Sequence, residues 1–187
     1  YYGENTVEAD RVDFDRRKNR LRASGNVRLT EPGGNVVHAA SMDLSEDLRD
    51  GFAQQLQLDT PERTRFLADS ARREGGNRTT FENGVYTVYT RPRTPPDKPP
   101  LWRIRAQTIV HNQEEKTIEF EKASLEFFGR SLAYLPYMSL PDPSVKRKSG
   151  LLVPSVVFGD RIGAGVRVPY YFALDPSYDL LLSATPL

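Results

Sequence analysis

The sequence predicts an all-β protein in which repeated hairpins are followed by longer alternating strands. One β-pattern recurs four times before residue 130, and after residue 150 the chain becomes apolar, aromatic and rich in glycine, with few charges. Apolar spacing of 3.6 residues is not sustained anywhere, which argues against helices. The contrast between the two parts indicates that they face different solvents.

The composition narrows the class of protein. With 38% hydrophobic and 27% charged residues among 187, the chain can bury a core. A formal net charge of +1 gives no general attraction to nucleic acid. The absence of cysteine excludes disulfides and thiolate metal sites within this segment. No apolar run approaches the ~20 residues of a membrane-spanning helix, and we expect a segment of a longer exported protein.

The first arm of each repeat follows the pattern apolar-x-Ala-x-x-apolar. The copies begin at Val7, Val37, Phe66 and Ile104, so the offsets are 30 (37−7), 29 (66−37) and 38 (104−66). The longest offset contains the proline-rich stretch 91–100. Because proline cannot donate to a sheet ladder, we expect that stretch to protrude or run extended.

A second arm follows each first arm, beginning near Ala23, Phe52, Phe81 and Phe120, with a polar turn between the two. Both arms alternate with period 2, so each repeat is expected to be a hairpin with one apolar face. The register breaks after each alanine, which predicts a bulge or corner there. One hairpin is barely stable in water, whereas four stacked hairpins bury a continuous interior.

The recurring alanines have two interpretations. One is tight packing of sheet on sheet at a corner. The other is a groove kept open between two sheets, suited to an acyl chain, which gains ~0.8 kcal/mol per buried CH₂ without directional chemistry. The residues predicted to line such a groove are Val7, Ala9, Val27, Val37, Ala39, Phe52, Leu56, Phe66, Ala68, Phe81, Ile104, Ala106, Phe120 and Phe127.

The tail alternates over a longer distance. Even-numbered positions from Ile162 to Phe172 are apolar or aromatic, a length that matches a tilted membrane β-strand of ~9–11 residues. A short turn is expected at 173–176, after which alternation resumes from Tyr178. Aromatic residues gather around that turn, as in an interfacial girdle. A water-soluble β-sandwich could show the same pattern.

Three motifs in and after the junction carry a resemblance to a known family. They are Lys146-Arg-Lys-Ser-Gly-Leu-Leu-Val-Pro-Ser155, Val168-Pro-Tyr-Tyr171 and Pro176-Ser-Tyr-Asp179. With the four repeats before them, they resemble the LptD family of lipopolysaccharide-assembly outer-membrane proteins, also called organic solvent tolerance proteins. The resemblance implies an OstA-type β-jellyroll over residues 1–135, a linker over 136–150, and the first strands of a transmembrane β-barrel over 151–187.

The resemblance also implies a function without catalysis. Such a protein transports lipopolysaccharide into the outer leaflet of the outer membrane, its jellyroll lying in the periplasm. The groove would hold acyl chains and pass them to a laterally opening barrel. The implied partners are lipopolysaccharide, a lipoprotein plug of the LptE type, and a bridge jellyroll of the LptA type docked edge to edge. The family places the docking edge at Thr6–Ala9, and no cofactor is implied.

Two groups of residues carry over from the family pattern. Pro154 and Pro169 match prolines of its first two barrel strands, and each removes a backbone N–H, so they would form a weakly paired lateral gate. Either proline could instead mark a strand end or a bulge. Lys146, Arg147 and Lys148 would contact phosphate at the membrane surface, the alternative being an ordinary solvated charge run.

No residue pattern indicates catalysis or a metal site. His38 and His111 occupy different positions in their repeats, so no shared role is expected. The chain lacks a nucleophile elbow, a phosphate-binding glycine loop and a zinc-protease motif. The alternative function from another class is a structural or carbohydrate-binding β-sandwich. A glycoside hydrolase is a weaker rival, because the carboxylates fall in turns.

Overall fold

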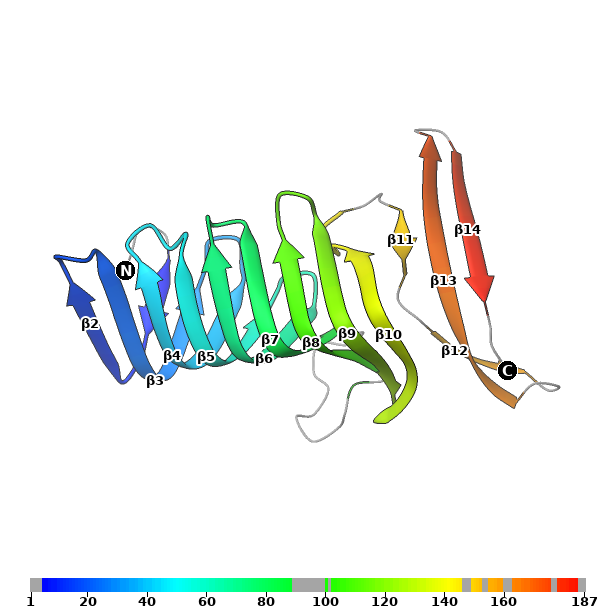
Figure 1. The fold of residues 1–187 in the computed structure, drawn as a ribbon, viewed down its shortest axis with the longest axis horizontal. Helices are drawn as coiled ribbons and strands as arrows, with labels where there is room; N and C mark the ends of the chain where they lie inside the picture. The colour runs from blue at the N-terminus through cyan, green and yellow to red at the C-terminus, as the bar shows by residue number, and fades with distance from the viewer. Residues whose placement is uncertain are drawn as a thin grey trace.

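The computed structural model describes residues 5–88, 100, 102–145, 149–152, 155–159, 163–175 and 178–184. Its regular structure is β throughout, as the sequence predicted. A ten-stranded antiparallel sheet has the order β1-β3-β4-β5-β6-β7-β8-β9-β10, with β2 also paired to β3, and a four-stranded sheet contains β11 to β14. Figure 1 shows the strands of the large sheet following one another from the blue to the yellow end, and the second sheet beyond them.

The large sheet is a succession of hairpins. From β3 onward each strand pairs with the next along the chain, while β1 and β2 pair with the two halves of β3. Its strands are β1 (Thr6–Glu8), β2 (Arg11–Asp15), β3 (Arg20–Thr30), β4 (Val36–Ser45), β5 (Gly51–Asp59), β6 (Thr64–Glu74), β7 (Arg78–Val88), β8 (Trp102–Asn112), β9 (Thr117–Phe127) and β10 (Arg130–Pro141). The proline-rich stretch predicted to protrude lies almost wholly outside the described residues.

The sheet folds over on itself along a row of corners. Every second strand has one residue with left-handed backbone there: Asn26, Gln55, Asn83 and Lys122, with φ between 48° and 51°. In two of them the asparagine amide donates to an aspartate of a neighbouring first arm, as from Asn83 Nδ2 to Asp69 at 2.9 Å. The predicted corner is present, and the left-handed residues that turn it stand in the second arms.

The corner changes which residues face inward. On β4 the buried side chains are Ala39 before the corner and Met42 and Leu44 after it, so the two-residue step switches the alternation. Without that step, one half of the strand would present its polar side chains to the interior. Each strand from β3 to β9 therefore contributes to two layers that enclose one apolar interior. The open side opposite the corners is called the mouth below.

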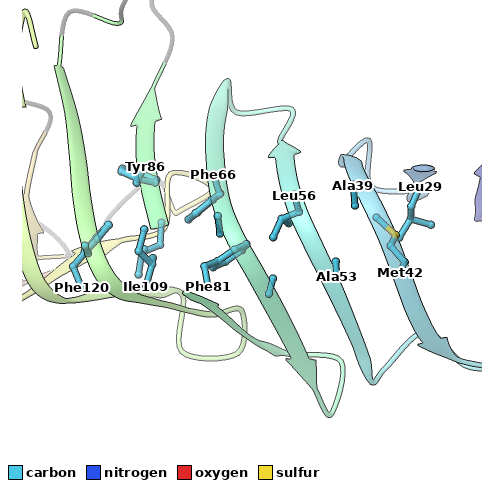
Figure 2. Packing of buried hydrophobic residues seen from close by; sticks show 14 of the residues in the cluster. Leu29, Ala39, Met42, Ala53, Leu56, Phe66, Phe81, Tyr86, Ile109 and Phe120 are labelled. Carbon is cyan, nitrogen blue, oxygen red and sulfur yellow. The ribbon is translucent and has the colours of Figure 1, made fainter. Parts of the chain in front are cut away.

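Aromatic side chains fill the middle of this interior. Phe66 and Phe81 come from opposite layers, and their rings stack with centroids 4.9 Å apart. Tyr86 meets Phe120 edge-on across the same space at 5.4 Å. Figure 2 shows these side chains and Ile109 pointing toward one another between the strands. Phe66, Phe81, Phe120 and Ile109 are at most 1% exposed, so this part of the core is fully dry.

The second sheet consists of β11 (Gly150–Leu151), β12 (Ser155–Gly159), β13 (Gly163–Asp175) and β14 (Tyr178–Ala184). The turn expected at 173–176 is placed wrongly, because β13 runs on to Asp175, which pairs with Tyr178 after an irregularity beyond Ala173. On β14, Leu180, Leu181 and Leu182 are 43%, 57% and 53% exposed. Successive leucines on both faces of one strand therefore remain uncovered.

The two sheets meet at the end of β10. This strand passes the predicted domain boundary at Leu135 and runs to Pro141. A Cβ atom placed on Gly150 would lie only 2.5 Å from Cδ of Pro141, so glycine permits this close approach. Within the described ranges, no helix has the length and apolar character that crossing a membrane would require.

Candidate functional site

The candidate site is the apolar interior between the two layers, and its narrow end is packed tightly. Ala39, Ala68 and Ala106 are buried along the row of corners, with at most 9% exposure. A Cβ atom added to Gly84 would lie 2.5 Å from Cδ1 of the buried Ile109. Small residues stand where the layers converge, which is the tight-packing interpretation of the alanine pattern.

Most of the predicted lining residues point into this interior. Val7, Ala9 and Val37 are half-buried against the core. Phe52 is 36% exposed, because it alternates with the buried Gly51 and Ala53. The buried members of the predicted set are Val27, Ala39, Leu56, Phe66, Ala68, Phe81, Ile104, Ala106, Phe120 and Phe127.

Among the described residues, the free space between the layers is divided into separate cavities. A cavity of about 80 Å³ lies toward the N-terminal strands, where Leu29, Met42, Leu56 and Phe81 form part of its wall. We call it the N-terminal cavity. The aromatic cluster separates it from the space farther along the sheet, so a long chain would have to displace side chains to pass.

A larger cavity of about 290 Å³ lies at the C-terminal end. Its wall is formed by β7 to β10 and by Leu152, which follows β11, and it includes the buried Trp102 and the half-buried Leu125 and Met138. We call it the junction cavity, because strands of the large sheet and Leu152, next to the second sheet, line it. Sequence analysis missed Trp102, although it alternates in phase with Ile104 and Ala106 on β8 and so belongs to the inward-facing set.

The third space, of about 270 Å³, is polar and lies at the mouth. His111 and Asp142 meet there in a buried hydrogen-bonded pair formed by Nε2 and the carboxylate. The amide of Ser144 also donates to the carboxylate at 2.8 Å. Burial by itself would raise the pKa of Asp142, but the hydrogen bonds from His111 and Ser144 outweigh it and hold this pKa well below its usual range.

The histidine was predictable as an inward-facing residue, and its partner was not. His111 stands two residues after Ile109 on β8, in phase with the buried side chains, and its ring stacks on Phe66 at 5.7 Å. Asp142 follows the end of β10, where no strand alternation specifies its direction. His38 is exposed on β4, apart from His111. Within the described part of the chain, no three potential metal-ligating side chains gather.

The remaining predicted residues lie in or before the second sheet. Pro169 is on β13, between two segments that pair with different strands. Before it, β13 pairs with β12 as far as Ser155–Arg167, and after it with β11 from Leu151–Tyr170. Between these pairs the carbonyl of Pro169 accepts a hydrogen bond from the amide of Leu152 at 2.8 Å. Pro154 and the basic residues Lys146, Arg147 and Lys148 lie outside the described residues.

Comparison with known proteins gives a consistent result for this arrangement. The chain is 34% identical over 191 aligned residues to the LPS-assembly protein LptD of Albidiferax ferrireducens, an alignment that covers 98% of the chain. It is 31% identical to the LPS-assembly protein LptD of Vibrio cholerae, with 95% of the chain covered. Over this segment, the chain belongs to the LptD family.

The LptD relatives are much longer than the chain, which spans 23% and 22% of their lengths. The fold has a solved counterpart in LptH, described as the LptA homologous periplasmic component of the lipopolysaccharide transport device of Pseudomonas aeruginosa. The TM-score is 0.51 at 10% identity, and the match covers 63% of this chain and 81% of that one. It confirms the predicted jellyroll of repeated hairpins. No protein-family model matches the chain.

Proposed function

We propose that this chain is the periplasmic jellyroll and the first barrel strands of an outer-membrane protein that transports lipopolysaccharide. The observation that carries the proposal is the junction cavity of about 290 Å³, because its apolar wall extends from the jellyroll strands to Leu152 beside the second sheet. A cavity in this position could pass acyl chains from one sheet to the other. No chemical step is required, which agrees with a transport protein and not with an enzyme.

The chemistry of the interior supports acyl chains as the cargo. The walls of the N-terminal and junction cavities are mainly aliphatic and aromatic. Each CH₂ group transferred into such space contributes ~0.8 kcal/mol. The polar space with His111 and Asp142 lies at the mouth. Sugars and phosphates of a glycolipid would therefore remain on the wet side while its chains lie inside. Because aromatic residues divide the space, passage requires them to change rotamer.

The second sheet is proposed to be the start of the barrel wall. The exposed Leu180, Leu181 and Leu182 of β14 require cover that the described residues do not supply. We expect lipid to cover one face of β14. Further strands, or a plug of the LptE type, would cover the other face. The register of the ladder on one side of β13 shifts by one residue between Arg167 and Tyr170, which supports a weakly paired gate formed by Pro169 with Pro154. Lys146, Arg147 and Lys148 would contact lipid phosphates next to it.

The N-terminal edge is proposed as the docking edge for a bridge jellyroll of the LptA type. β1 and β2 each pair only with β3 among the described strands, so their outer edges remain available for strand addition. The exposed Val12 on β2 adds apolar surface at this edge. The edge includes the predicted Thr6–Ala9 segment. A chain of docked jellyrolls would place their apolar interiors end to end across the periplasm.

Photo-crosslinking at two adjacent residues tests the proposal. Met138 lines the junction cavity, whereas the neighbouring Tyr137 is 57% exposed. A photoreactive residue at 138 is expected to form adducts with lipopolysaccharide in cells, and the same residue at 137 is expected to form few. Adducts at neither position, with both variants folded, would contradict transport through this interior. Sugar adducts at position 137 alone would favour a carbohydrate-binding β-sandwich.

A further inference from the structure

One ion pair of the jellyroll joins the two layers across the mouth. Arg73 lies near the end of β6 in one layer, and Glu31 lies in the turn between β3 and β4 at the tip of the other layer. Arg73 Nη1 donates to Glu31 Oε1 at 2.5 Å. Two strands, β4 and β5, separate β3 from β6 in the sheet order. The contact therefore joins the two layers across the mouth and does not link neighbouring strands.

Other charged contacts of the sheet have a different character. Arg65 pairs with Asp59 on the adjacent strand, and Arg20 pairs with Asp43 on the adjacent strand. Arg103 and Glu126 do the same between β8 and β9. These pairs lie along one layer and leave the distance between the layers free. The Glu31–Arg73 pair is thus suited to hold the mouth shut.

The pair also forms the roof of the N-terminal cavity. Glu31 and Arg73 border that cavity together with Leu29, Leu44 and Phe81. The same two side chains border the open polar hollow on the outer side. An amphiphile that enters the N-terminal cavity through this part of the mouth therefore passes beside them. The acyl chain of the amphiphile would insert into the apolar cavity, and its head group would remain next to the guanidinium of Arg73.

Arg73 has hydrogen-bonding capacity that Glu31 does not use. Its Nη2 donates to the carbonyl of Gly76 at 3.0 Å. Its Nε is buried and has no acceptor among the described residues. The side chains of Arg73 and Glu31 are 28% and 16% exposed, so solvent reaches part of both charged groups. A phosphate can replace the carboxylate and engage the planar guanidinium with two parallel hydrogen bonds.

We propose that the Glu31–Arg73 pair is a displaceable clasp over the N-terminal cavity, and that Arg73 exchanges Glu31 for the phosphate of an anionic acylated lipid. This inference rests on the proposed function, since it assumes that acyl chains enter the interior. It adds where the chains enter, which head-group chemistry opens the mouth, and which side chain recognises it. The released Glu31 retains Asn35, whose Nδ2 already donates to Oε2 at 2.8 Å.

Two variants separate opening of the clasp from recognition of phosphate. Glu31→Gln removes the ion pair and keeps the cation, whereas Arg73→Gln removes both. The matched control is Asp59→Asn, which breaks the pair with Arg65 of similar exposure, 31% and 33%, within one layer. The probes are lipid A and lipid A stripped of its phosphates, presented to the full chain from zwitterionic vesicles. A photoreactive residue at position 58 reports entry by cross-linking, because the half-buried Leu58 lines the N-terminal cavity.

The clasp predicts a different result for each variant. Glu31→Gln should take up both probes faster than wild type, because the mouth no longer has to be opened. Arg73→Gln should take up only the stripped probe faster than wild type. Its affinity for lipid A should fall by about tenfold, the factor that one charge-assisted hydrogen bond supplies. Arg73→Lys keeps the positive charge but not the planar guanidinium. Its affinity for lipid A should therefore lie between those of wild type and Arg73→Gln. Asp59→Asn should behave as wild type.

The outcomes distinguish this inference from the proposed function. If position 58 forms adducts with both probes and all variants match wild type, the clasp is refuted and transport through the interior stands. If position 58 forms adducts with neither probe in any variant, and position 138 forms none, both are refuted. Urea unfolding of each variant establishes that it is folded before binding is measured.

Discussion

The filled middle of the interior gives the sharpest stability prediction, tested by Phe81→Ala. The ring of Phe81 is 0% exposed and stacks on Phe66 across the two layers at 4.9 Å. Truncating a fully buried phenylalanine costs about 3–5 kcal/mol in the free energy of unfolding. Phe81 also borders the N-terminal cavity of about 80 Å³, so the missing ring would enlarge existing space. That places the expected cost toward the upper end of the range.

Urea and thermal unfolding measure the effect, with Phe52→Ala as the matched control. Phe52 lies on the adjacent part of the sheet and is 36% exposed, so its truncation should cost no more than about 1 kcal/mol. For a chain of this size, each kcal/mol lowers Tm by about 2–4 °C, so Phe81→Ala should lower it by roughly 6–20 °C. Equal losses for the two variants would refute the assignment of Phe81 to the fully buried interior and of Phe52 to the partly exposed rim of the N-terminal cavity.

Two further predictions concern the narrow end and the buried acid. Gly84→Ala should lower the free energy of unfolding by about 1–3 kcal/mol, because the new methyl meets Ile109 at 2.5 Å, whereas Gly33→Ala, with nothing within 4 Å, should be nearly neutral in the same thermal scan. The lowered pKa of Asp142 means that its stabilisation is present above the unfolded-state pKa near ~4 and is lost as pH falls toward the folded-state value. Asp142→Asn should therefore reduce stability at neutral pH and flatten the loss of stability below about pH 4, and an unchanged acid limb in urea titrations would contradict this.

Local sequence determined the strands and their inward faces. Alternation with period 2 depends only on which side of the strand each residue occupies, so Val27, Phe66, Ile104 and Phe120 could be assigned to the interior without coordinates. The Ala-x-x step identified a corner for the same local reason. The motifs around 146–155 and 168–179 likewise indicated the LptD family before any contact was known.

The tertiary structure decided what depends on which layers face each other. The strand register places Ala53, and not Phe52, in line with Phe81 through Ala71, an offset of one residue that apolar spacing did not distinguish. Contacts between distant segments, such as Glu31 with Arg73 and His111 with Asp142, depend on how the layers close. The division of the interior into separate cavities follows from aromatic rings that meet across it. Alternation is a property of one strand, whereas these features belong to pairs of strands whose spacing no single segment specifies.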